Sequence, residues 1–437
     1  LNGSENFEPG KQYGFFPAGA FAWVPSSYEF IRENVSWLNF LKLRVSYGVV
    51  GNDRISSRRF PYLTLIKEEN ASNPWGGTGS LTEEQVGANN LMWEKAKKFD
   101  VGMDLHLFKD KFTLTLDYFK DTRDGIFQER KQIPDYVGLI QMPYGNIGRM
   151  KSWGADGNME FYQQIGKDAH VILRSNFTLS KNKILNWEDT KKPYLENNGY
   201  ANNVQRGFVA MGLFKDQQDV EMSPTQFGTV RPGDIKYRDI NGDGKITDDD
   251  KVPLFAYSGV PQLMYGIGAE FRYKSWTLNV LFKGTGRNKF LYGGSDGRNF
   301  DGYMPFNQKD KGNIMTIAYN PENRWISAEY SGNQATENPN ARFPRLYYGK
   351  NENNTKPSTF WMGDARYLRL QELSLAYNLK VPALQRILGI NSMNIQLMCE
   401  NLAVWDSVNI FDPEQATSCG QAYPLPARYS LQLYLNF

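Results

Sequence analysis

Apolar and polar residues alternate with a period of two in many separate stretches of this chain. Residues 99–107 carry apolar side chains at the odd positions and mostly polar or small ones at the even positions. After a short link, residues 112–119 repeat the pattern. Such alternation is typical of a strand with one apolar and one polar face, and two strands joined by a short link predict a hairpin.

The same pattern predicts eleven antiparallel strands along the chain. They lie near 14–25, 41–49, 93–107, 112–126, 147–162, 169–184, 263–273, 276–286, 361–378, 393–404 and 428–437. The links at 26–40, 108–111, 163–168, 274–275 and 379–392 are short, and those at 50–92, 127–146, 185–262, 287–360 and 405–427 are longer. Outer-membrane β-barrels alternate short periplasmic turns with long outside loops in this way, so an all-β transmembrane barrel is favoured over a soluble sandwich.

Three details of the last strands add to this interpretation, and the first is an exception to the regular alternation. The apolar phase changes within residues 367–377, which predicts a β-bulge near Gln371 and Glu372. Cys399 shares a face with Ile395 and Leu397, so we expect it to face lipid. The final strand alternates up to the terminal Phe437, which we interpret as a signal for the barrel-assembly machinery, with an ordinary core residue as the alternative.

Composition removes several classes of function. The 437 residues carry a net charge of only +3, and the basic residues are scattered, so the sequence offers no concentrated positive charge that would attract nucleic acid. Two cysteines and two histidines, His106 and His170, are too few for a disulfide framework or for chemistry on clustered imidazoles. No apolar run is long enough for a transmembrane helix, so a membrane role requires a β-barrel.

Short motifs occur in order along nearly the whole chain. They are YGFFP at 13–17, LKLRVSYG at 41–48 with GN at 51–52, NLMWE at 90–94, DYF at 117–119, SKNKI at 180–184, the loop at 239–250, NPNARFPR at 338–345, YLRL at 367–370, ENL at 400–402 and YPLPARYS at 423–430. With these motifs the chain resembles the SusC-like (SusC/RagA-type) TonB-dependent outer-membrane transporters of Bacteroidota.

The resemblance implies a 22-stranded barrel with a plug, of which residues 1–437 would be the C-terminal half. The missing half would carry the signal sequence, the plug, the segment contacted by TonB and the other strands. The implied function is TonB-dependent import of glycans or peptides through the outer membrane. A SusD-like lipoprotein would be the surface partner, the TonB complex would act through the absent N-terminal part, and the wall would contact outer-membrane lipids.

No catalytic residue is predicted, and we expect a transporter rather than an enzyme. Two alternatives stay open on the sequence. The first is a soluble secreted β-rich module that binds or hydrolyses carbohydrate and carries a calcium loop. The second is a passive porin, which would share the strands but lack a plug and energy coupling.

One metal-binding motif stands out within the predicted outside loop 185–262. Residues 239–250 place oxygen ligands at the spacing of a wrapped Ca²⁺ ion, with Gly244 at the sharp turn. The predicted ligands are Asp239, Asn241, Asp243, Lys245 through its backbone carbonyl, and Asp250. Asp250 replaces the usual Glu. The alternative is a set of Asx turns that needs no ion. A structural Ca²⁺ ion is thus the predicted cofactor, and none is predicted for activity.

Other candidate residues receive structural interpretations first. His106 lies on the polar side of its strand, where we expect a hydrogen-bonding role. Aromatic residues in the long loops suit stacking on sugars or peptides, or packing within the loops; they are Trp325, Tyr330, Phe343, Tyr347, Tyr348, Phe360 and Trp361. Cys419 falls in the last outside loop, so its pairing with Cys399 is not expected.

Overall fold

The computed structural model describes residues 1–54, 60–72, 78–88, 90–139, 141–189, 195–256, 259–292, 316–347, 351–380, 382–418 and 422–437. Tyr348 and Cys419 lie outside the described residues. Within these ranges, no helix is both long and apolar enough to cross a membrane.

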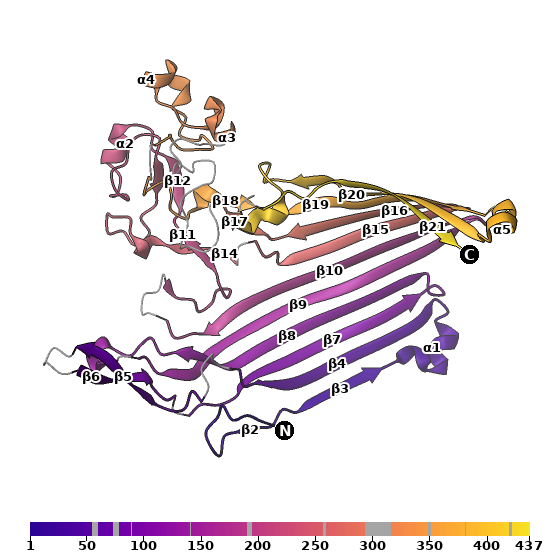
Figure 1. The fold of residues 1–437 in the computed structure, drawn as a ribbon, viewed down its shortest axis with the longest axis horizontal. Helices are drawn as coiled ribbons and strands as arrows, with labels where there is room; N and C mark the ends of the chain where they lie inside the picture. Colours follow the sequence, from indigo (N-terminus) through magenta and orange to yellow (C-terminus); the bar gives the residue numbers. More distant parts are fainter. Residues whose placement is uncertain are drawn as a thin grey trace. The chain divides into compact units, whose positions relative to one another are not determined.

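The chain is organised as two compact units. Unit 1 holds the chain up to β10, with part of β15, and unit 2 holds the loops after β10 and everything from β16 onward. Unit 1 contains β1 (Asn2–Gly3), β2 (Tyr13–Gly14), β3 (Ala18–Trp23), η1 (Pro25–Ser27), α1 (Glu29–Asn34), β4 (Leu38–Asn52), β5 (Leu65–Ser72), β6 (Thr78–Gln85), β7 (Glu94–Leu107), β8 (Phe112–Glu129), η2 (Asp135–Val137), β9 (Tyr144–Ile165) and β10 (Ala169–Asn186). The long strands lie side by side in Figure 1.

Unit 2 adds short elements in the loops and longer strands after them. The loop elements are β11 (Gln205–Gly207), β12 (Ala210–Leu213), α2 (Gln217–Glu221), β13 (Ile235–Tyr237), η4 (Asp248–Asp250), β14 (Val252–Phe255), β17 (Lys289–Leu291), α3 (Thr316–Tyr319), η7 (Pro321–Asn323), α4 (Ala328–Ser331), η8 (Gln334–Thr336), η9 (Thr359–Trp361), β18 (Met362–Asp364), α5 (Pro382–Leu388) and η10 (Pro413–Ser418). The longer strands are β16 (Trp276–Gly286), β19 (Tyr367–Leu379), β20 (Ser392–Asp406) and β21 (Arg428–Asn436). β15 (Leu263–Tyr273) is divided, with Leu263–Gly266 in unit 2 and the rest in unit 1.

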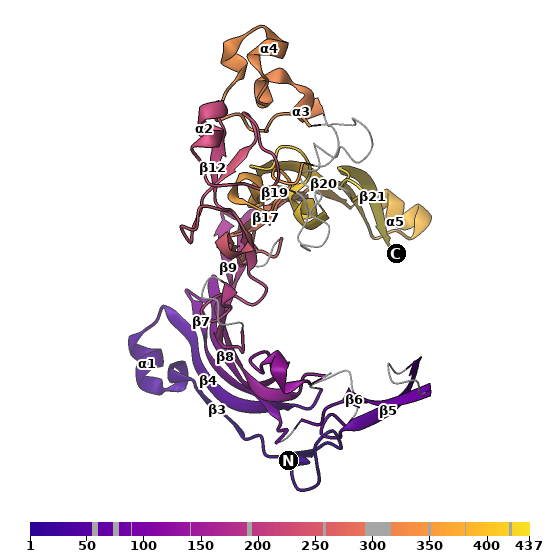
Figure 2. The ribbon, with the colours of Figure 1, turned by 90° about the vertical axis from the view of Figure 1, so that its left-hand side faces the viewer.

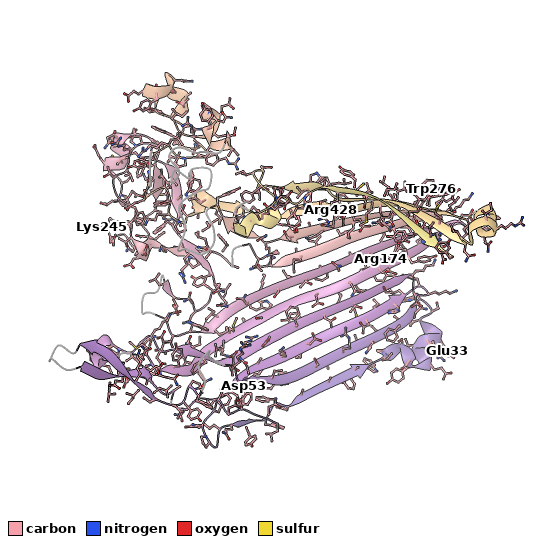
Figure 3. The ribbon with its side chains drawn as sticks, viewed as in Figure 1. Glu33, Asp53, Arg174, Lys245, Trp276 and Arg428 are labelled. Carbon is pink, nitrogen blue, oxygen red and sulfur yellow. The ribbon has the colours of Figure 1, made fainter. Side chains whose placement is uncertain are left out.

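One antiparallel sheet of eleven strands has the order β21-β20-β19-β16-β15-β10-β9-β8-β7-β4-β3. These are the eleven predicted strands, each paired with its neighbours along the chain, so the all-β prediction is confirmed. The predicted link lengths also hold. In unit 1, residues 108–111 and 166–168 make tight turns, whereas the β5–β6 hairpin occupies the long link. Figures 1 and 2 show α1 and this hairpin at opposite ends of β4, and Figure 3 shows Glu33 and Asp53 there.

Three details differ from the prediction or refine it. The predicted strand 361–378 is two elements, β18 and β19, separated by a break at Ala365 and Arg366. The first predicted strand is shorter, because β3 begins only at Ala18. The predicted bulge is confirmed: the register of β19 shifts between Leu370 and Glu372 against both of its neighbours.

Candidate functional site

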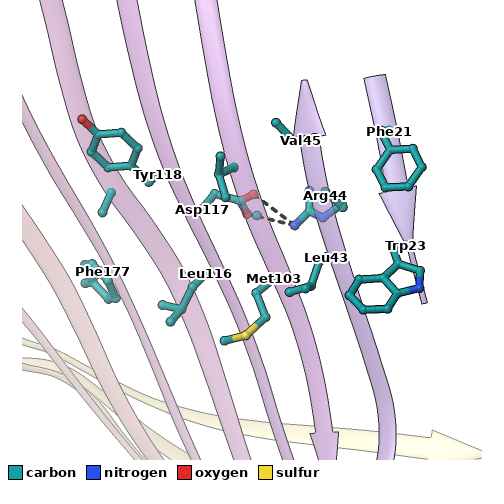
Figure 4. A pocket seen from close by; sticks show the side chains of 13 residues that line it. Phe21, Trp23, Leu43, Arg44, Val45, Met103, Leu116, Asp117, Tyr118 and Phe177 are labelled. Carbon is teal, nitrogen blue, oxygen red and sulfur yellow. Dashed lines mark hydrogen bonds and ion pairs between the residues drawn. The ribbon is translucent and has the colours of Figure 1, made fainter. Parts of the chain in front are cut away.

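The polar face of the unit 1 strands carries an ion-pair cluster around one guanidinium. Arg44 on β4 is opposite Gly102 on β7, which is opposite Asp117 on β8. Arg44 Nε lies 3.1 Å from Asp104 Oδ2, and Nη2 lies 3.1 Å from Asp117 Oδ1. Figure 4 shows the pair between Arg44 and Asp117. The cluster therefore ties three strands together through their polar side chains.

Gly102 makes this cluster possible. A Cβ atom at this position would lie 2.1 Å from Asp117 Oδ1 and 2.8 Å from Arg44 Cζ. Real Cβ contacts are not this short, so any side chain would have to displace the guanidinium. The absence of a side chain on β7 gives Arg44 room to reach the carboxylate two strands away.

A second buried ion cluster fixes the link between β20 and β21 in unit 2. Arg369 on β19 is 2% exposed and donates from Nη2 to both carboxylate oxygens of Asp412, at 2.7 and 2.6 Å. Its Nε donates to Glu414 at 3.1 Å, and Lys283 Nζ lies 3.0 Å from the same carboxylate. Close by along the chain, Val408 packs in an apolar cluster with Phe290. The link is thus anchored to β16 and β19.

The large loops of unit 2 form an assembly with its own apolar core, which we call the loop assembly. It comprises described residues within 205–255 and 316–361. Its core packs Phe208, Ile235, Tyr237, Phe343 and Trp361, which are all at most 2% exposed. Tyr237 Oη donates to the backbone carbonyl of Asn353, and burial raises the pKa of this phenol. The core joins two stretches that are far apart in sequence.

A buried carboxylate links the same two stretches through polar contacts. Asp234 is fully buried and accepts hydrogen bonds from Arg345 Nη2 at 2.9 Å, Asn351 Nδ2 at 3.1 Å and Asn354 Nδ2 at 2.8 Å. The amide of Arg231 donates to it at 2.8 Å. Because a buried charge is costly unless it is paired and hydrogen-bonded, this arrangement is a strong constraint on the assembly.

The predicted calcium loop is an ordered turn in which carboxylates accept backbone hydrogen bonds. Asp239 accepts from the amides of Gly242 and Gly244 at 2.7 and 2.8 Å, and the Gly244 amide is the main cause of its lowered pKa. Asp250 is fully buried and accepts from the amides of Ile240 and Thr247, both at 2.8 Å. The Asp239 contacts are those of the Asx-turn alternative, whereas Asp250 forms a capping box with Thr247 at the start of η4.

The other predicted ligands are engaged in the same way. The side-chain oxygen of Asn241 accepts from the amide of Asp243 at 2.9 Å, and Asp243 Oδ1 accepts from the amide of Lys245 at 2.9 Å. Across the described residues, no group of three or more His, Cys, Asp or Glu side chains is arranged to hold a metal ion. The carboxylates retain lone pairs, so Ca²⁺ binding stays a prediction.

The remaining candidates divide into buried and exposed side chains. Trp325, Phe343 and Trp361 are 6%, 2% and 2% exposed, so they are core residues and do not offer a stacking surface. Tyr330 and Tyr347 are 84% and 41% exposed. Phe360 is partly buried and packs against the core.

The histidines and Cys399 occupy structural environments. His106 Nδ1 lies 3.0 Å from Asp110 Oδ1, and His170 Nε2 lies 3.8 Å from Glu270 Oε1. Cys399 is a free thiol opposite Leu373 and Tyr429, on the apolar face as expected. Phe437 follows β21 and is 73% exposed, and its assembly role stays a prediction.

Comparison with known proteins identifies the family. The family described as "TonB dependent receptor-like, beta-barrel" matches residues 2–295. The chain therefore belongs to the TonB-dependent receptor β-barrel family, which places it in the outer membrane and excludes the soluble module. The predicted SusC-like resemblance is confirmed.

Individual relatives agree with this assignment. TonB-dependent receptor P3 of Formosa agariphila is 24% identical over 430 residues, which cover 94% of this chain and 39% of that protein. TonB-dependent receptor SusC of Bacteroides thetaiotaomicron is 26% identical over 305 residues, covering 67% of this chain and 29% of SusC. The chain thus spans about two-fifths, or less, of these relatives.

Solved structures show the same fold. The RagAB peptide transporter has a TM-score of 0.70 at 20% identity and covers 100% of this chain and 45% of its own. The RagAB peptide importer in the "open-open" state gives 0.70 at 18% identity, covering 99% and 44%.

Proposed function

We propose that this chain is part of an importer that carries oligomeric nutrients, glycans or peptides, across the outer membrane at the expense of TonB-transmitted energy. The observation that carries the proposal is the family's barrel sheet combined with an ordered loop assembly on its long links. A solved structure named as a peptide transporter supports the peptide class, and the SusC-like resemblance implies the glycan class. The work is binding and gating, without covalent catalysis.

The eleven-stranded sheet ends in β3 and β21. A sheet with two open edges would leave backbone groups unpaired in lipid, at a cost of several kcal/mol for each. We infer that residues 1–437 form the C-terminal half of a closed barrel, with the residues between β10 and β15 in an outside loop. The TonB contact and the plug would belong to the other half.

A SusD-like lipoprotein is the proposed partner on the outside. The exposed side chains of the long loops, such as Tyr330 and Met222 at 84% and 78% exposure, provide surface for such a contact. Affinity purification of the tagged full-length protein from outer membranes should recover a lipoprotein at equal stoichiometry. Recovery of the transporter alone would contradict this part of the proposal.

The transport proposal is tested in cells that depend on one oligomer class. Deletion of the full-length gene should abolish growth on either oligosaccharides or peptides while growth on the monomers continues. Loss of TonB should have the same effect. Uptake that persists without TonB, together with open conductance in planar bilayers, would favour the passive porin.

A further inference from the structure

An apolar depression lies on the outward face of the unit 1 strands. Its volume is about 590 Å³. The lining side chains with apolar character include Phe21, Trp23, Val45, Val101, Tyr118 and Ala155. By strand alternation these side chains lie on the opposite face from those of Arg44 and Asp117, which also border the depression. Figure 4 shows Phe21, Val45 and Tyr118 over neighbouring strands.

The register explains the shape of this depression. Phe21 on β3 is opposite Val45 on β4, which is opposite Val101 on β7. Val101 is opposite Tyr118 on β8, and Tyr118 is opposite Ala155 on β9. The large rings of Phe21 and Tyr118 thus lie on both sides of the smaller Val45 and Val101. The small side chain of Ala155 leaves further space beyond Tyr118. Such a channel suits a flexible acyl chain.

A row of lysines lies on the same outward face, next to the depression toward the long links. We call it the basic belt; its members are Lys97, Lys120, Lys151, Lys181 and Lys183. Lys120 follows Tyr118 by two positions on β8, about 7 Å along the strand. Its direct neighbours are Phe99 and Trp153, and Trp153 is in turn opposite Lys181.

The belt carries excess positive charge. Asp124 pairs with Lys97 at 2.8 Å and with Arg149 at 2.6 Å. Among the described residues, no carboxylate forms an ion pair with Lys120, Lys151 or Lys181. Lys151 Nζ lies 4.9 Å from the centroid of the Trp153 ring. The aliphatic part of Lys151 and the indole of Trp153 therefore lie together where the apolar surface meets the polar one.

The position of the belt defines the membrane leaflet. Long links of this barrel class are on the outside, and the belt lies between the depression and these links, from the middle of β8 at Lys120 to the beginning of β7 at Lys97. The depression is therefore within the outer leaflet, and the belt is at the level of its head groups. Charge complementarity then requires an anionic head group, and phosphates suit several neighbouring ammonium groups.

We propose that this face binds an outer-leaflet lipid that carries both phosphate groups and acyl chains. One acyl chain occupies the depression, and the phosphates contact Lys120, Lys151 and Lys181. The inference does not depend on which nutrient is transported. It assigns a specific lipid site to one part of a wall that would otherwise contact lipid without selectivity.

The test uses the delipidated full-length protein in a neutral detergent, titrated with diphosphoryl lipid A and followed by native mass spectrometry. Wild type should retain one lipid per protein. Replacing Lys120, Lys151 and Lys181 with Ala should weaken binding by about 100-fold, because each cation near an anionic surface contributes roughly a fivefold factor. Ala155→Leu, which fills the depression, should weaken it by about tenfold.

The control replaces Lys109, Lys111 and Lys167, which lie at the short turns, with Ala; binding should be unchanged. Heat-dependent migration on gels reports whether each variant is folded. Equal affinity of wild type and the belt variant would overturn the proposal, as would equal binding of phosphatidylcholine. Full displacement by inorganic phosphate would show a free-anion site, and a dimer that occludes the belt would show that a second copy takes the face.

Discussion

The strands of unit 1 expose large apolar side chains on one face, whereas the loop assembly of unit 2 buries its own. Phe21 and Tyr118 on the strands are 66% and 45% exposed, but Phe208 and Tyr237 in the loop assembly are 0% and 1% exposed. Both regions carry buried or half-buried ion pairs on their polar sides. The two regions differ in what covers their apolar side chains: lipid covers those of the strands, and other protein side chains cover those of the loop assembly.

This difference separates two sources of stability. The strands satisfy their backbone groups through the ladder and rely on lipid to cover the apolar face. The loop assembly behaves like a small soluble domain, with close-packed aromatic residues and a paired buried charge. Damage to one region should therefore leave the other intact, and each prediction below tests that separation.

The largest effect is expected for Asp234→Ala. The substitution leaves Arg345 beside an empty, buried position, and breaking a buried ion pair costs roughly 3–5 kcal/mol. Residues in the loop assembly should become sensitive to external protease, while heat-dependent migration of the barrel is unchanged. Asp248→Ala is the control, because that carboxylate pairs with Lys251 at the surface and its side chain is 73% exposed. Equal protease resistance of both variants would contradict the assigned role.

The next largest effect is expected for a substitution in the barrel wall, that is, in the long strands of unit 1. Gly102→Val should displace Arg44 from Asp117 and cost roughly 1–3 kcal/mol through overpacking. The temperature at which the barrel band shifts on a gel should fall, while protease resistance of the loop assembly stays as in wild type. Gly19→Val provides the control, because a Cβ there meets nothing within 4 Å. A similar decrease for both variants would show that the polar cluster has no special importance.

The strands could be predicted from the sequence because their signals are local. Period-two alternation fixes which side chains share a face, so the eleven strands and the bulge at Gln371 followed directly. The alternation also placed Gly102 on the polar side. It could not show that Arg44 reaches across Gly102 to Asp117, because that depends on the register of three strands.

The loop assembly could not be predicted in the same way. Asp234 and Asn354 are 120 positions apart, and no local pattern reports their hydrogen bond. Trp325, Phe343 and Trp361 were interpreted as either ligand contacts or packing residues, since aromatic residues next to amides occur in both settings. Only the folded loops show that they are core. For the 239–250 loop, residue spacing alone leaves both the ion and the Asx turns open.

A smaller effect is expected from Ca²⁺ on the 239–250 loop. If Ca²⁺ binds, an ion at fivefold excess over its Kd stabilises the folded loop by about 1 kcal/mol. Protease resistance of the loop assembly should rise with Ca²⁺ and not with Mg²⁺, and Asp239→Asn should remove the rise. The wall should not respond. An absence of any change at millimolar Ca²⁺ would establish the ion-free Asx turns.

The smallest effect concerns a half-buried ion pair in the loop assembly. Lys236 Nζ lies 2.7 Å from Asp219 Oδ1, and the amide of Lys215 donates to Oδ2 at 3.2 Å. Burial acts to raise the pKa of Asp219, but these two hydrogen bonds together with the charges of Lys236 and Lys215 outweigh it, and the pKa is lowered.

A carboxyl group with a lowered folded pKa stabilises the fold above its unfolded value, which is near 3.9, and that contribution is lost as the pH falls through the folded value. The stability of the loop assembly, followed by its protease resistance, should therefore decline below about pH 4, by no more than about 1 kcal/mol. Asp219→Asn should be weaker than wild type at pH 6, and the difference should shrink as the pH falls below about 4. A constant difference between the two proteins across this range would mean that the charge of Asp219 does not contribute. The pair lies outside the strands of the barrel, so heat-dependent migration of the barrel band should be the same for both proteins at every pH.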